Sequence, residues 1–268
     1  MQVFLNEREI TVPTGTTLKQ LSSQQKADAD LIILNGFPSN ADPPLNESDR
    51  IVLIKRGEIP APEELEALMM SRHTPGVHEK VRNSSVGIAG AGGLGSSIAL
   101  ALARIGVGRL IVVDFDLVEP SNLNRQQYFI DQIGQPKVEA LRDNLLRTNP
   151  LVKVQAIHDR VTAGNIKHLF GTVDVLAEAF DAADQKSMLV SGFLSQCPGM
   201  PLVAASGIAG FGPANEIRTE KVTKQLYIVG DGCSAAQPGQ GLMAPRVGIA
   251  AGHQANAILR LLLGKEPA

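Results

Sequence analysis

Six residues constrain this chain most: Gly90-Ala91-Gly92-Gly93-Leu94-Gly95 lie between an apolar strand pattern and a helical pattern. The apolar run at residues 86–89 precedes them, and residues 96–105 continue as an amphipathic helix. Glycines at such a junction let the backbone approach a phosphate, whose charge meets free N–H groups and the positive end of the helix dipole. The segment therefore predicts a nucleotide site, and a tight turn without a ligand is the alternative.

Strand and helix patterns alternate from residue 86 onward. Strand-length apolar runs occupy residues 110–113, 152–157, 173–177 and 202–205, and helical patterns follow at 136–146, 162–170 and 243–263. This alternation implies parallel strands joined by right-handed crossovers. We predict an α/β fold over residues 81–268, with a Rossmann-like, mostly parallel sheet and flanking helices.

The first 58 residues have a different order. Strand patterns at residues 2–5 and 10–12 form a hairpin, and Thr17 with Gln20 is a capping-box pattern that begins a short helix. Further strand patterns follow at 31–34 and 51–54. Two strands, a helix and two strands are the order of a small β-grasp (ubiquitin-like) domain, which we place at 1–58, with a helical connector at 59–80.

Polar residues beyond the second strand of the α/β domain indicate which nucleotide would bind. Asp114 ends that strand, 19 residues after Gly95, where a carboxylate can accept hydrogen bonds from ribose hydroxyls. Arg125 and Lys137 follow at the same sheet edge, where open α/β sheets bind ligands. Two cations suit a triphosphate better than the pyrophosphate of NAD, although either one alone is more often a solvated surface residue.

Asp181 follows the strand pattern at 173–177 and so comes to the same edge as the glycine loop and Asp114. A carboxylate that faces a triphosphate is repulsive unless a cation lies between them, so we expect Mg²⁺ held by Asp181 and phosphate oxygens. The alternative is that Asp181 is the N-cap of the next helix, and the sequence does not separate the two.

GAGGLG, DFDLVEPSNLNRQ, GQPK and Asp181 together resemble the ThiF/MoeB/HesA family, relatives of the ubiquitin-activating enzymes, over about residues 65–264. The resemblance implies an enzyme, a nucleotidyltransferase in which a carrier carboxylate attacks the α-phosphorus of ATP to give an acyl-adenylate and pyrophosphate. It implies that Asp181, Arg125, Lys137 and Arg72 are catalytic, with Asp181 also holding Mg²⁺. Arg72 is similar to the family's arginine finger, which often comes from the other subunit, and this implies a homodimer. The ATP-binding residues that it implies are Gly90, Gly92, Gly93, Gly95, Asp114, Asp116, Asn122, Arg125 and Lys137.

The N-terminal piece resembles ThiS, the sulfur carrier of thiamine thiazole synthesis, but it lacks the accessible Gly-Gly end that a carrier needs. Gly57 is followed by Glu58, and the chain continues. We therefore interpret it as a degenerate carrier and expect the substrate to be a separate ThiS-like sulfur carrier protein. Adenylation of a MoaD-like carrier, an NAD(P)-dependent oxidoreductase and a nucleotide-binding scaffold without turnover are the alternatives.

Composition excludes several classes of protein and site. Lys+Arg 25 against Asp+Glu 27 gives a net charge of -2, which argues against a nucleic-acid partner held by bulk charge. No stretch approaches the ~18 apolar residues of a membrane span, and the start lacks a signal pattern, so we expect a cytoplasmic protein without a membrane partner. Two cysteines cannot form a four-thiolate zinc site, so no structural zinc is expected. Cys197 is expected to be a packing residue, and whether the loop thiol of Cys233 is covalently catalytic stays open.

Overall fold

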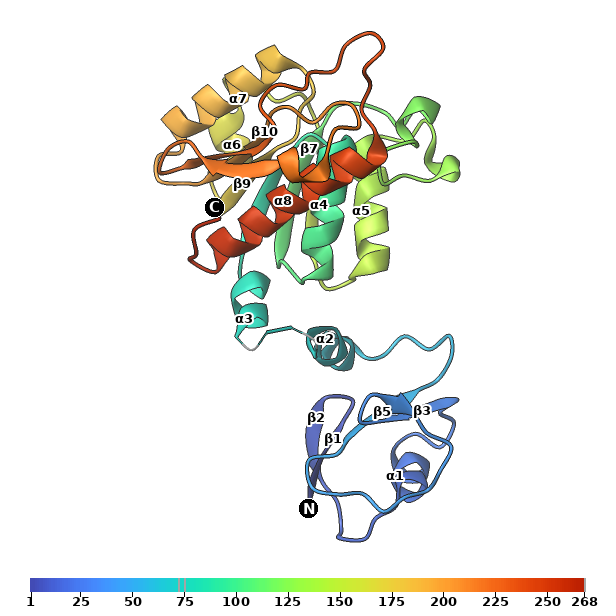
Figure 1. Cartoon of the computed structure of the whole chain (residues 1–268). Helices are drawn as coiled ribbons and strands as arrows, with labels where there is room; N and C mark the ends of the chain where they lie inside the picture. Colours follow the sequence, from blue (N-terminus) through green and yellow to red (C-terminus); the bar gives the residue numbers. More distant parts are fainter. Residues whose placement is uncertain (72, 75, 268) are drawn as a thin grey trace. The chain divides into compact units, whose positions relative to one another are not determined.

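The computed structural model describes residues 1–71, 73–74 and 76–267, which fall into two compact units, Met1–Thr74 and Pro75–Ala268 (Figure 1). Among these residues, no helix combines the length and the apolar character that a membrane span requires.

The first unit is a five-stranded sheet in the order β2-β1-β5-β3-β4, packed on one helix. Its two central strands, β1 and β5, are parallel and the other pairs are antiparallel, which confirms the predicted β-grasp fold. Thr17 forms the predicted capping box with Gln20, and the buried core includes Val3, Leu18 and Ile51. Its elements are β1 Gln2–Leu5, β2 Arg8–Thr11, α1 Leu18–Gln25, β3 Leu31–Leu34, β4 Phe37–Pro38, β5 Arg50–Ile54 and α2 Pro62–Met70.

The second unit contains a seven-stranded sheet in the order β11-β12-β10-β9-β6-β7-β8, parallel except for β11. The Rossmann-like prediction is confirmed. Its strands are β6 Ser85–Ala89, β7 Arg109–Asp114, β8 Lys153–His158, β9 Val175–Glu178, β10 Leu202–Ala205, β11 Arg218–Lys221 and β12 Leu226–Gly230. Its helices are α3 Val77–Arg82, α4 Gly93–Arg104, η1 Pro120–Asn122, η2 Ile130–Gln132, α5 Lys137–Thr148, α6 Ile166–Phe170, α7 Ala183–Gln196, η3 Ala214–Glu216 and α8 Ala244–Leu262.

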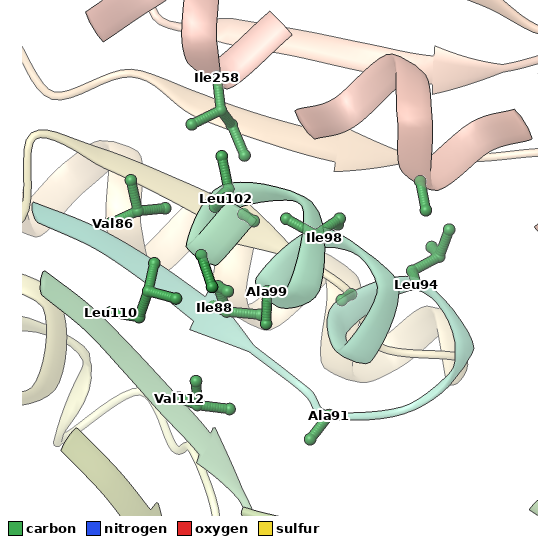
Figure 2. Packing of buried hydrophobic residues seen from close by; sticks show 14 of the residues in the cluster. Val86, Ile88, Ala91, Leu94, Ile98, Ala99, Leu102, Leu110, Val112 and Ile258 are labelled. Atoms are coloured by element: carbon green, nitrogen blue, oxygen red, sulfur yellow. The ribbon is translucent and has the colours of Figure 1, made fainter. Parts of the chain in front are cut away.

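Helices cover both faces of this sheet, so alternate residues of each strand enter different cores. In β7, Leu110 and Val112 join the cluster under α4, α5 and α8, whereas Ile111 and Val113 join the cluster under α6 and α7. Figure 2 shows Leu102 of α4 beside Ile258 of α8, above the apolar side chains of β6 and β7. This packing fixes the N-terminus of α4 relative to the carboxyl end of β6.

The strand order changes direction at β6. The chain runs outward from β6 to β7 and β8, then returns to place β9 on the other side of β6. Ligands of open α/β sheets bind in the crevice at such a switch point, outside the carboxyl ends of the strands. The glycine loop that follows β6 and the Asp181 loop that follows β9 both begin there.

Candidate active site

A cavity of about 600 Å³ lies at this carboxyl edge. It is large enough for a nucleotide, since small-molecule sites are commonly ~300–1,000 Å³. The structure brings most of the predicted site residues into its lining, namely Gly90, Gly92, Gly93, Asp114, Asp116, Arg125, Lys137 and Asp181.

The glycine loop fits a phosphate. Gly90 has φ +98°, which disfavours other residues, and a Cβ there would lie 2.8 Å from the carbonyl oxygen of Ala179. A Cβ on Gly92 would meet its nearest neighbour, Gln126 Nε2, only at 3.9 Å, so it would occupy open cavity. The N-terminus of α4 has no side-chain cap. Uncapped N–H groups and space for an anion beside Gly92 are what phosphate binding requires.

Tyr128 holds the glycine loop in place through a side-chain hydrogen bond. Its hydroxyl donates a hydrogen bond to the carbonyl oxygen of Ala91 at 2.7 Å, and the residue is buried. Burial, with Asp114 and Asp116 nearby, raises the pKa of the Tyr128 hydroxyl well above its usual range. The hydroxyl therefore stays a donor to the loop at any physiological pH.

Two predicted residues do not line the cavity, and a third lies outside the described residues. Gly95 is required for packing, because a Cβ there would lie 1.8 Å from the carbonyl oxygen of Gly90. Asn122 is buried, and its Oδ1 accepts a hydrogen bond from the backbone N–H of Glu119 at 3.1 Å, so it holds the η1 turn. Arg72, the predicted arginine finger, falls on a residue that the structure does not describe.

Asp114, which the sequence predicts to bind a ribose, lines the cavity. It ends β7 and is 9% exposed. Its two carboxylate oxygens accept hydrogen bonds from the backbone N–H groups of Ala91, at 2.6 Å, and Asp116, at 2.7 Å. Each oxygen keeps a second lone pair, so the carboxylate can still accept hydrogen bonds from two hydroxyls.

The two predicted phosphate-binding cations differ in their surroundings. Lys137 is 6% exposed and its Nζ lies 2.7 Å from Asp116 Oδ2, so it is a nearly buried, paired cation at the first turn of α5. Arg125 is half-buried, and its Nη1 donates to the carbonyl oxygen of Ser121 at 3.1 Å and to Asn124 Oδ1 at 2.8 Å. These bonds orient the guanidinium while Nη2 and Nε stay available for an anion.

Asp181 is exposed and lines the cavity from the loop that follows β9. It is not a helix cap, because α7 has Ala182 as its N-cap without a side-chain hydrogen bond. Among the described residues, no three His, Cys, Asp or Glu side chains cluster as a metal site. A single exposed carboxylate fits Mg²⁺, which takes few protein ligands and fills its octahedron with phosphate oxygens and water.

The sequence analysis missed an ion pair at the base of the cavity. Glu178 is fully buried at the end of β9, and Lys186 on α7 lies 2.9 Å from its Oε2. Lys186 lines the cavity. A charged residue inside a buried strand is itself an indication of function, but the partner eight residues later is evident only once α7 folds back over the strand end.

Cavity walls from three further loops were also missed. Phe115 and Arg160 stack at 3.8 Å beside Asp114, and both line the cavity. Loops at residues 206–209 and 234–236 complete the lining. The second loop is held by Asp231, whose Oδ2 lies 2.6 Å from the guanidinium of buried Arg246. Cys233 is exposed in that loop, whereas Cys197 is buried in the core under α6 and α7, as predicted.

Comparison with known proteins finds adenylyltransferases among the relatives of this chain. A profile described as ThiF family matches residues 66–268, and one described as ThiS-like ubiquitin matches residues 1–57. The chain is 30% identical over 198 residues to the molybdopterin-synthase adenylyltransferase of Escherichia coli (strain K12). The matched region covers 69% of this chain and 76% of the E. coli protein. It is 39% identical over 108 residues to the sulfur carrier protein adenylyltransferase of Thermus thermophilus, 40% of each chain.

A solved structure confirms the fold. The crystal structure of E. coli tRNA N6-threonylcarbamoyladenosine dehydratase, TcdA, in complex with ATP has a TM-score of 0.64 at 21% identity. The similarity covers 73% of this chain and 92% of that one.

Proposed function

Since the chain belongs to the ThiF family, we propose that it is an ATP-dependent adenylyltransferase whose substrate is a separate ThiS-like sulfur carrier protein. The reaction joins the carrier's C-terminal Gly-Gly carboxylate to the α-phosphorus of ATP and releases pyrophosphate. The observation that carries the proposal is one cavity that has the glycine loop, Asp114, Arg125 and Lys137 on one side of the switch point and Asp181 on the other.

The groups in the cavity match what this reaction needs. A carboxylate nucleophile is ionised at neutral pH, so the protein has to position the reactants and neutralise charge rather than remove a proton. Asp114 orients the ribose, and the N-terminus of α4 receives a phosphate. Arg125 and Lys137 neutralise phosphate oxygens. Asp181 would hold Mg²⁺, and the metal would supply further neutralisation of phosphate charge.

The pathway is proposed from the N-terminal unit. Residues 1–57 match the ThiS-like ubiquitin description, which favours a thiamine-type carrier in thiazole synthesis. The similarity to a molybdopterin-synthase adenylyltransferase favours a MoaD-like carrier as the second candidate. Both carriers would present the same carboxylate, so the chemistry in the cavity is common to the two.

The fused unit is not itself the substrate in this proposal, because its tail is held in place. The backbone N–H of Arg56 donates to Asp30 Oδ2 at 2.7 Å, and Lys26 pairs with Glu58 at 3.0 Å. Gly57 lies in a turn with φ +78°, between these two anchors. A carrier that is adenylated needs an extended Gly-Gly tail with a free end, and this anchored turn is not such a tail. We propose that residues 1–58 are a degenerate carrier domain, 59–80 a connector and 81–268 the catalytic domain, in a cytoplasmic homodimer to which Arg72 contributes.

Exchange of labelled pyrophosphate into ATP tests the proposal. With a ThiS-type carrier that ends in Gly-Gly, we expect exchange by the wild type and a loss of at least about 100-fold in Asp181→Asn, with nucleotide affinity changed only a few-fold. Asp184→Asn is the matched control, because Asp184 is exposed in the first turn of α7 but does not line the cavity. ATP binding without exchange across several carriers would contradict the enzyme proposal and favour a scaffold.

A further inference from the structure

The Glu178 carboxylate holds both ends of the segment that carries Asp181. Its Oε1 accepts a hydrogen bond from the backbone N–H of Phe180 at 2.7 Å, directly before Asp181. Lys186, on the first turn of α7, lies 3.0 Å from Oε1 and 2.9 Å from Oε2. The chain leaves β9, passes Asp181 and returns to the same carboxylate, so this short loop is closed by one buried group.

The pair also ties the loop to the neighbouring strand. Lys186 Nζ donates to the carbonyl oxygen of Ala205 at 3.0 Å, and the backbone N–H of Ala205 donates to Glu178 Oε2 at 3.3 Å. Ala205 ends β10, and residues 206–209 after it line the cavity. The end of β9, the start of α7 and the end of β10 are therefore fixed to one ion pair.

Lys186 lines the cavity but has no free proton for a phosphate. An ammonium group has three N–H donors, and the three oxygens that Lys186 meets are the two of Glu178 and the carbonyl of Ala205. Glu178 has no exposed surface at all. The two charges neutralise each other, Glu178 fully buried and Lys186 with a side chain 24% exposed, so neither is placed to bind the nucleotide directly.

We propose that Glu178 and Lys186 are positioning residues, which set where the Asp181 carboxylate stands in the cavity and so determine the affinity for the divalent cation that Asp181 would hold. The inference deepens the proposed function and rests on Asp181 as the cation ligand. Glu178 is fully buried, and an unpaired charge there would be strongly unfavourable, which explains why it is paired with Lys186.

The test measures cation binding directly, with Mn²⁺ as a spectroscopic probe in place of Mg²⁺. Electron paramagnetic resonance gives the Mn²⁺ affinity of the full chain in the presence of ATP, and a separate titration gives the affinity for ATP without metal. We expect Glu178→Gln to weaken Mn²⁺ binding about 10- to 100-fold, as supporting residues of metal ligands do. The affinity for metal-free ATP should stay within a few-fold of the wild type. Asp181→Asn should likewise weaken Mn²⁺ binding and leave the affinity for metal-free ATP within a few-fold.

Three further variants separate positioning from a merely structural role. Lys186→Arg keeps the charge and should retain most of the Mn²⁺ affinity, and Asp184→Asn should retain all of it. The double variant Lys186→Met/Glu178→Gln leaves no unpaired charge, and its Mn²⁺ affinity is measured instead if Glu178→Gln does not fold. Equal weakening of Mn²⁺ and metal-free ATP binding, no change in either, or failure of both Glu178 variants to fold would overturn the proposal.

Failure of the proposed function can be distinguished from failure of the positioning proposal. If the wild type binds Mn²⁺ with ATP but shows no pyrophosphate exchange with any carrier, adenylation is contradicted while the Mn²⁺ comparison still decides the role of the pair. If the wild type shows no ATP-dependent Mn²⁺ binding, Asp181 is not a cation ligand and the positioning proposal falls with it.

Discussion

At the residue scale, the glycines of one loop have two different functions. The sequence presents Gly92 and Gly95 as equivalent members of a motif, and only the structure separates them. A side chain on Gly92 would extend into the cavity, whereas one on Gly95 would collide with the backbone of Gly90. The first glycine leaves room for a ligand, and the second allows α4 to pack closely against the loop.

Substitution by alanine should separate these functions. Gly92→Ala should leave the free energy of unfolding within about 1 kcal/mol of the wild type, since Gly92 has φ −76° and open space. It should weaken ATP binding about tenfold, about 1.4 kcal/mol of binding free energy. Gly95→Ala should destabilise the fold by about 3 kcal/mol. Thermal unfolding and ATP titration measure both, and a stable Gly95→Ala or a tightly binding Gly92→Ala would contradict the assignment.

At the element scale, the sequence predicts those strands and helices whose positions are determined by local residue patterns. The five strands of the α/β core from residue 86 to 205 and the helix α4 follow from apolar runs and glycine boundaries, and the structure agrees. The hairpin of β11 and β12 was missed. Arg218–Lys221 is mostly exposed and has no apolar face to reveal it, whereas Leu226–Gly230 is an apolar, mostly buried run that could have been recognised as a strand. Most predicted site residues follow motifs at strand ends, whereas the Glu178–Lys186 and Asp231–Arg246 pairs depend on how a helix folds back against the end of the strand or loop before it.

The Asp231–Arg246 pair anchors the loop at 231–243 to α8. The Asp231 side chain is 7% exposed, and it also accepts hydrogen bonds from the backbone N–H groups of Cys233 and Ser234, both at 2.8 Å. Burial acts to raise the pKa of the Asp231 carboxyl, but the hydrogen bonds from Ser234 and Cys233 outweigh it and hold the pKa well below its usual range. The folded state therefore binds the proton more weakly than the unfolded state, and the stabilisation is complete only above the unfolded pKa of about 4.

Asp231→Asn should therefore cost less stability in acid than at neutral pH. We expect a loss of about 3 kcal/mol in the free energy of unfolding at pH 7, because buried Arg246 loses its close carboxylate partner and keeps only Glu216, at 3.8 Å. At pH 3 the loss should be smaller by about 1 kcal/mol, since wild-type stabilisation decreases below pH 4. Denaturant unfolding of both proteins at the two pH values checks this, and an equal loss at both would contradict it.

At the scale of the whole molecule, the chain combines a carrier-like unit with a carrier-activating unit. The first has the β-grasp sheet, but the chain leaves its last strand, β5, through a turn held by Asp30 and Lys26 and continues into α2. The second has a cavity lined by the groups that the proposed adenylation would use. The account therefore expects the reactive carboxylate to come from a different protein, and the fused unit to contribute no C-terminus of its own.

Carrier-dependent pyrophosphate exchange by the wild-type chain tests this account most directly. Three reactions are compared: no carrier, a ThiS-type carrier that ends in Gly-Gly, and the same carrier without its last glycine. The account predicts exchange with the intact carrier, and none without a carrier or with the shortened one. Equal exchange in all three reactions, or no exchange with intact ThiS-type and MoaD-type carriers in the presence of bound ATP, would contradict the claim that this chain adenylates a separate carrier.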